Sequence, residues 1–157
     1  QGLEIVSVEH DMSWHLKVKS VLEKNLASNV HLFHIAPEAN TKLSEVDGSE
    51  HDVDNRLNAA PQKDELFYDY TRSIQEYPDQ SFDLILVDGR ARVGCLQMCL
   101  KKIKVGGAVI LDNSERADYD QGMRLFQEPD WQVIHFPGPG PLSIWPVFWQ
   151  STGFIKR

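Results

Sequence analysis

Two pairs of residues that could carry chemistry stand directly after the two most apolar runs of the chain. Asp88 and Gly89 follow one run of four apolar residues, and Asp112 and Asn113 follow the other. Open α/β sheets bind their ligands at the carboxyl ends of their strands, so acids in these places are candidates for binding or catalysis. Asp88 is the first candidate for a catalytic residue, because the glycine after it lets the chain turn closely past a ligand.

The stretch 81–114 predicts the strand–helix–strand unit that would place these acids at one edge. Its apolar runs, 84–87 and 108–111, are typical of central parallel strands that are covered on both faces. Between the two runs, apolar residues at positions 96, 99, 100 and 103 recur at helical spacing, and Gly106-Gly107 is predicted to end that helix.

A strand, a helix and a more exposed strand are predicted ahead of this unit, at 3–9, 12–26 and 30–35. Apolar residues, Trp14 and Val21 among them, form one face of the helix, and Asp11 or Ser13 can cap it. The segment 38–65 has eight acids and three bases, so it carries −5 of the net charge of −7 and predicts a long solvated loop. A short aromatic helix around Tyr68 and Tyr70 follows it.

After the central unit the sequence predicts a helix and two strands, at 119–127, 131–136 and 148–155. The two strands are expected to pair antiparallel because the connection between them is short. The run 137–141 contains three prolines, which lack a backbone donor, so it is predicted to be a loop that cannot continue the strand.

Length, net charge, hydropathy and cysteine spacing limit the classes of protein to which the chain can belong. A chain of 157 residues fits a single domain. The net charge of −7 argues against a nucleic-acid partner, and no apolar stretch approaches the ~20 residues of a membrane span. Cys95 and Cys99 lie one helical turn apart and fit small buried residues better than a redox pair. A cytoplasmic enzyme is the expectation.

Several stretches, taken together, resemble class I S-adenosylmethionine-dependent methyltransferases. They are the strand leading into Glu9, the aromatic run 68–70, and the segments 82–92, 104–107 and 111–116. The resemblance covers nearly the whole chain. It implies a Rossmann-like, doubly wound, mostly parallel sheet with a C-terminal antiparallel strand, and methyl transfer from S-adenosylmethionine to a small-molecule acceptor, at oxygen.

The resemblance also implies a set of cofactor-binding residues: Glu9, His10, Tyr70, Asp88 and Gly89. Glu9 follows the family's second strand, where a carboxylate can accept hydrogen bonds from ribose hydroxyls; the other interpretation is a helix-capping or surface acid. Tyr70 could flank the adenine or be a core ring.

In the metal-dependent, catechol-type branch of the family, acids after the fourth strand and an Asp-Asn pair after the fifth hold a divalent cation. Asp88, Asp112 and Asn113 match these types and places, and their oxygen ligands suit Mg²⁺. The other interpretation is that Asp112-Asn113 caps a helix and that Arg90, Arg92 and Arg116 pair with the acids.

One departure from the family is serious. The family's first strand, with its glycine-rich turn, has no counterpart before residue 1, so we expect residues 1–157 to be a fragment that starts at the second strand and lacks the middle of its sheet. Another segment or chain could fill the gap, and a homo-oligomer is left open. Two other functions stay open: a non-catalytic Rossmann-like module that has lost the cofactor turn, and a nicotinamide-dependent oxidoreductase.

Overall fold

The computed structural model of the protein describes residues 2–38, 66–139 and 148–157. Within them the elements are β1 (Ile5–Glu9), α1 (Met12–Lys24), β2 (Val30–His34), α4 (Tyr68–Arg72), the 3₁₀ turn η1 (Ser73–Glu76), β3 (Phe82–Val87), α5 (Arg92–Lys102), β4 (Ile103–Leu111), the 3₁₀ turn η2 (Ala117–Tyr119), α6 (Asp120–Met123), β5 (Trp131–Pro139) and β6 (Phe148–Lys156). The predicted acidic loop lies outside the described residues, apart from Glu38.

The described strands form two separate sheets, which is the main feature of the fold. β1 pairs with β2 in parallel, and the second sheet has the order β3-β4-β6-β5. β3 and β4 are parallel, while β6 runs antiparallel to both of its neighbours, β4 and β5. The predicted α/β fold, with a mostly parallel arrangement and a C-terminal antiparallel strand, is confirmed.

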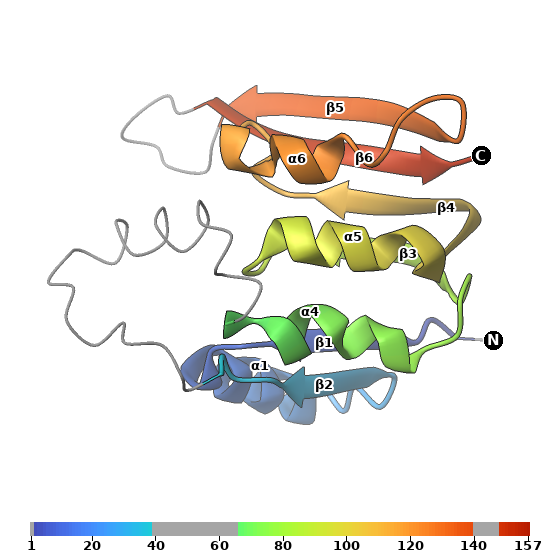
Figure 1. The fold of residues 1–157 in the computed structure, drawn as a ribbon. Helices are drawn as coiled ribbons and strands as arrows, with labels where there is room; N and C mark the ends of the chain where they lie inside the picture. The colour runs from blue at the N-terminus through green and yellow to red at the C-terminus, as the bar shows by residue number, and fades with distance from the viewer. Residues whose placement is uncertain (1, 39–65, 140–147) are drawn as a thin grey trace, which may run out of the picture.

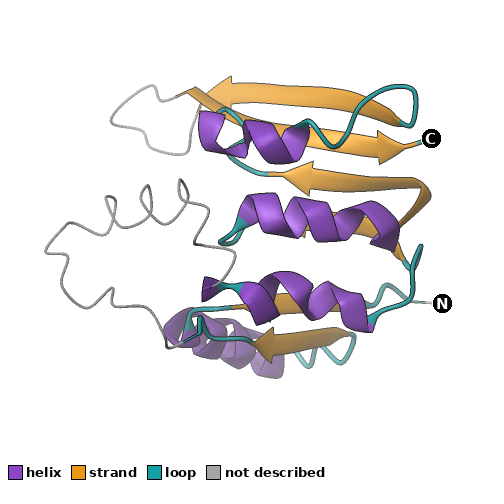
Figure 2. Ribbon diagram, in the orientation of Figure 1, coloured by secondary structure: helices purple, strands orange, loops and turns teal. Residues whose placement is uncertain are grey.

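Helices lie on both sides of the strands. In Figure 1, α5 and α6 lie in front of the larger sheet, whereas α1 lies behind β1 and β2. Figure 2 shows the same alternation of helix and strand along the chain. The doubly wound arrangement follows from this placement, because consecutive parallel strands are joined by helices that cross over the sheet.

The core lies between α5, α6 and the front face of the larger sheet. Leu96 and Cys99 of α5 pack there with Val109 and Leu111 of β4, all of them buried. In the same core Phe126, which follows α6, stacks on Phe154 of β6, with ring centroids 4.4 Å apart. The expected apolar role of Cys99 agrees with its burial.

Two predictions about burial were wrong. β3 was expected to be covered on both faces, yet Leu84 and Leu86 are 57% and 64% exposed. Side chains alternate along a strand, so Ile85 and Val87 face α5 and the two leucines face the opposite side. The predicted apolar face of α1 is also uncovered, because Trp14 and Val21 are exposed and the helix has no buried residue.

Two predictions about element ends were also wrong. α5 ends at Lys102, before Gly106-Gly107, and β4 runs through both glycines, with Gly106 in the left-handed region at φ +80°. β5 extends to Pro139 and stays paired with β6 across Pro137. β5 is an edge strand, so two prolines spaced two residues apart can both turn their donor-free nitrogens away from the partner strand.

Candidate functional site

The candidate site lies where the carboxyl ends of β1, β3 and β4 carry their acids. Aromatic residues around the start of α4 connect the two sheets there: the ring of His10, after β1, lies 5.6 Å from Phe67 and 5.9 Å from Tyr70 between centroids. Phe67 and Tyr70 in turn pack with Ala91, at the start of α5. The structure therefore brings the predicted residues at the ends of β1 and β3 together.

Glu9 occupies the end of β1 with one carboxylate oxygen engaged. Its Oε1 accepts hydrogen bonds from the backbone N–H groups of His10 and Asp11, at 2.7 and 2.8 Å. Among the described residues, no hydrogen bond to its Oε2 is found. Asp11, in contrast, caps α1 as predicted, because it accepts from Trp14 N at 2.9 Å.

His10 is held as a neutral ring in this cluster. Burial lowers the pKa of His10 and outweighs the opposite pull of the neighbouring Glu9 carboxylate, while Arg90 adds to the lowering. Burial likewise raises the pKa of the Tyr70 phenol. Both groups stay uncharged at neutral pH and offer ring faces and edges rather than charge.

Gly89 is tightly packed rather than open. A methyl group on its Cα would run into the Tyr70 hydroxyl and would lie 3.2 Å from Tyr70 Cζ. The need for glycine at this turn therefore comes from a tyrosine that closes over it. The predicted close passage of a ligand beside Gly89 stays a prediction.

The two aspartates of the site differ in environment. Asp88 is 59% exposed and makes an ion pair with Arg92. Its partial burial and repulsion from Asp112 nevertheless raise its pKa, against the opposite effect of the Arg92 charge. Asp112 Oδ1 accepts from Ser151 Oγ at 2.8 Å and from Trp149 Nε1 at 3.3 Å. Burial opposes the ionisation of Asp112, but these hydrogen bonds hold its pKa below the usual range.

Asn113 does not fit the predicted magnesium set. It is buried, its backbone is in the left-handed region at φ +51°, and its Oδ1 accepts a hydrogen bond from Arg92 Nη1 at 3.1 Å. In the part of the chain that the structure describes, no group of three or more His, Cys, Asp or Glu side chains could hold a metal ion. Asp88, Asp112 and Asn113 do meet at one edge, around Arg92 rather than around an open coordination site.

Arg92 is the site residue whose importance sequence reasoning missed. The Asp88–Arg92 spacing of four residues was the available signal for a pair. Nothing in the sequence set Arg92 apart from Arg90 and Arg116 as the buried one. The residues around Asp112 in the sequence could not have predicted its contacts with β6, because these contacts depend on the register between β4 and β6.

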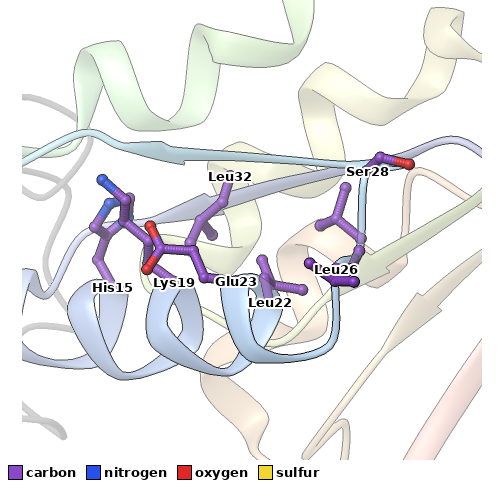
Figure 3. A pocket seen from close by; sticks show the side chains of 9 residues that line it. His15, Lys19, Leu22, Glu23, Leu26, Ser28 and Leu32 are labelled. Atoms are coloured by element: carbon purple, nitrogen blue, oxygen red, sulfur yellow. The ribbon is translucent and has the colours of Figure 1, made fainter.

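A hollow of a different kind lies between α1 and β2 (Figure 3). His15, Lys19, Leu22 and Glu23 line it from α1, and Leu32 lines it from β2. None of the predicted cofactor-binding residues is among its lining residues.

No helix in the described ranges is long and apolar enough to span a membrane.

Comparison with solved structures identifies the fold. No protein-family model matches the sequence, and no curated protein does either. A candidate methyltransferase from Streptococcus mutans, solved in complex with SAH, is 10% identical with a TM-score of 0.58; the match covers 96% of this chain and 75% of that one. A candidate caffeoyl-CoA O-methyltransferase from Staphylococcus aureus is 12% identical with a TM-score of 0.58. That match covers 99% of this chain and 65% of the other chain.

An rRNA methylase from Streptococcus thermophilus is 9% identical with a TM-score of 0.51, covering 98% of this chain and 73% of that chain. The protein therefore has the Rossmann-like fold of class I S-adenosylmethionine-dependent methyltransferases, and the predicted resemblance is confirmed at the level of the fold. The chain spans 65 to 75% of the length of these three structures.

The packing of Gly89 against Tyr70 predicts a coupled pair of substitutions. Gly89→Ala should destabilise the protein by about 1–3 kcal/mol through overpacking. In Tyr70→Phe the atom that the new methyl group meets first is absent, so adding Gly89→Ala to that variant should cost less. A double-mutant cycle by urea unfolding measures the coupling. Additive effects would contradict the contact.

The neutral state of His10 predicts a pH dependence of stability. The folded pKa lies below the unfolded value, so the unfolded chain binds more protons in the window between them. Stability should be fully present above about pH 6.5 and fall as the pH drops through the unfolded pKa towards the folded one. His10→Gln should flatten this fall, measured by thermal unfolding between about pH 7.5 and 5.

The matched control is His31→Gln, because His31 is an exposed histidine of β2 that pairs with Glu4. An unchanged pH profile in His10→Gln would contradict the assignment of the buried neutral ring.

Proposed function

We propose that the protein takes part in methyl transfer from S-adenosylmethionine to an oxygen of a small-molecule acceptor. The observation that carries the proposal is that the ends of β1 and β3 converge on Tyr70: His10, next to Glu9, packs against its ring, Gly89, next to Asp88, lies against its hydroxyl, and burial and the charges of both acids raise the pKa of its phenol. Parallel α/β sheets bind ligands at this edge, and the fold is that of methyltransferases.

The residues proposed to hold the cofactor fit its chemistry. Glu9 has one carboxylate oxygen fixed by backbone donors, which would orient the other towards two ribose hydroxyls. The uncharged rings of His10 and Tyr70 provide apolar surface for a base. When bound, S-adenosylmethionine supplies an electrophilic methyl group on a sulfonium ion.

The proposal includes an additional strand and helix between β1 and β3. Both strands have one edge without a pairing partner among the described residues, and their carboxyl ends lie together beside Tyr70. Leu84 and Leu86 are exposed on the face of the larger sheet opposite to α5, and Trp14 of α1 is exposed as well. A strand that pairs with both edges, followed by a helix behind it, would cover these residues and bring a cofactor-binding turn to the site.

Asp88 is the proposed residue on the acceptor side. Its carboxylate is exposed, its pKa is raised, and it can orient a hydroxyl group or accept its proton. A small acceptor is proposed because the net charge of −7 disfavours a phosphate backbone. The fold itself does not choose the acceptor, and an rRNA methylase shares it.

A second candidate is a non-catalytic binding module. It is favoured by the packing of Tyr70 against Gly89, which fills space that a cofactor could otherwise approach. Failure of the full-length protein to bind S-adenosylmethionine would favour this candidate over the enzyme. Binding of a nicotinamide cofactor instead would favour the oxidoreductase.

Cofactor binding gives the first test. We expect the full-length protein to bind S-adenosylmethionine, and Glu9→Gln to weaken the affinity about 10- to 100-fold, because a charged acceptor of hydrogen bonds is worth about 1.5–3 kcal/mol. The amide keeps one oxygen for the backbone donors. Glu4→Gln, an exposed acid at the start of the same segment, is the control. Equal calorimetric affinities of Glu9→Gln and the unmodified protein would remove Glu9 from the site.

Transfer to a panel of hydroxyl acceptors gives the second test. Asp88→Asn should lower turnover about 10²- to 10⁴-fold, the range of general acid–base catalysis, while the affinity for S-adenosylmethionine stays within a few-fold. Asp83→Asn is the control, because Asp83 is an exposed acid of β3 that pairs with Lys104 at 2.8 Å. Transfer only to nitrogen or RNA acceptors would contradict the proposed acceptor class.

A further inference from the structure

The guanidinium group of Arg92 is buried at the point where the predicted metal would sit. The side chain is 8% exposed. Its Nε donates to Gly89 O at 2.9 Å, Nη2 donates to Asp88 O at 2.9 Å and to Asp88 Oδ1 at 3.2 Å, and Nη1 donates to Asp112 O and, at 3.1 Å, to Asn113 Oδ1. Five oxygen atoms thus surround a group that has five N–H donors.

These acceptors include the oxygen atoms that a magnesium ion would need. Mg²⁺ requires near-octahedral oxygen ligands at about 2.1 Å. A cation bound to Asp88 Oδ1 or Asn113 Oδ1 would therefore lie within about 5 Å of an Arg92 nitrogen. Two positive groups so close in a partly buried place repel each other, and the asparagine oxygen would have to leave its guanidinium donor.

The amide orientation of Asn113 agrees with a guanidinium in this position. Its Nδ2 is buried and has no hydrogen-bond partner among the described residues, whereas its Oδ1 faces Arg92. Turning the amide over would place two donors against each other, so the guanidinium fixes which amide atom faces the site. A metal ligand would not require the rest of the side chain to be enclosed in this way.

We propose that Arg92 is the resident cation of this edge and takes the place of a divalent metal ion. It is a positioning residue: it holds the carbonyl groups after β3 and β4, sets the direction of the Asp88 carboxylate, and makes the edge independent of metal. The inference concerns the cation alone, so it does not depend on methyl transfer.

Chemical rescue tests the proposal. Arg92→Ala should lower the melting temperature of the chelator-treated full-length protein. Millimolar ethylguanidinium should restore part of the loss, whereas MgCl₂ at matched ionic strength should not. The melting temperature of Arg92→Lys should stay below that of Arg92→Ala with ethylguanidinium, because one ammonium group cannot reach acceptors on both strand ends. Arg124→Ala, an exposed arginine directly after α6, should respond to neither additive.

Metal binding by the unmodified protein gives a second measurement that does not require any Arg92 variant to fold. Water-proton relaxation with Mn²⁺ should be the same for the unmodified protein and for Asp88→Asn. Mn²⁺ binding that Asp88→Asn abolishes would overturn the proposal. Rescue of Arg92→Ala by Mg²⁺ rather than by ethylguanidinium would overturn it as well.

Discussion

The conformation of the candidate site depends on one buried cation, the guanidinium group of Arg92. Removing an arginine from water costs several kcal/mol unless its donors are bonded, and here the acceptors are mainly backbone carbonyl groups after β3 and β4. The loops that supply them contain Ala91 and Asn113 in the left-handed region, at φ +48° and +51°. That backbone costs roughly 1–2 kcal/mol per residue, which the guanidinium hydrogen bonds offset. Arg92 therefore contacts the Asp88 carboxylate and the backbone of Asp112, while Ser151 and Trp149 hold the Asp112 carboxylate.

A second interaction relates the two sheets. No strand pairing joins β1 to β3 among the described residues, so the aromatic cluster of His10, Phe67 and Tyr70 is the contact that relates the end of β1 to the turn after β3. Ring contacts are less directional than a ladder of hydrogen bonds. The position of the β1 end relative to β3 thus depends on side-chain packing, whereas the β3–β4 edge depends on strand pairing and the guanidinium group.

Sequence patterns predicted the parts of the fold that local forces decide. The apolar runs identified β3 and β4, and the aspartate before α1 identified its cap. The patterns could not show that Leu84 and Leu86 are exposed. An apolar run indicates which side chains favour burial, but it does not indicate whether a neighbouring element buries them. The prediction of a loop at Pro137 fails for the same reason: proline fits an edge strand but not a central one, and strand order is not a local property.

The same limit applies to charge, and it separates the two aspartates. From the sequence alone, Asp88 and Asp112 are equivalent, because each directly follows a predicted strand. In the structure, the register of β4 with β6 brings Ser151 and Trp149 to Asp112 alone. Those donors keep Asp112 ionised, while burial and the charge of Asp112 raise the pKa of Asp88. Environments that separate the pKa values of two neighbouring acids assign them different roles. In the proposed reaction this favours Asp88 as the group that exchanges a proton with the acceptor, and Asp112 as the fixed negative charge beside it.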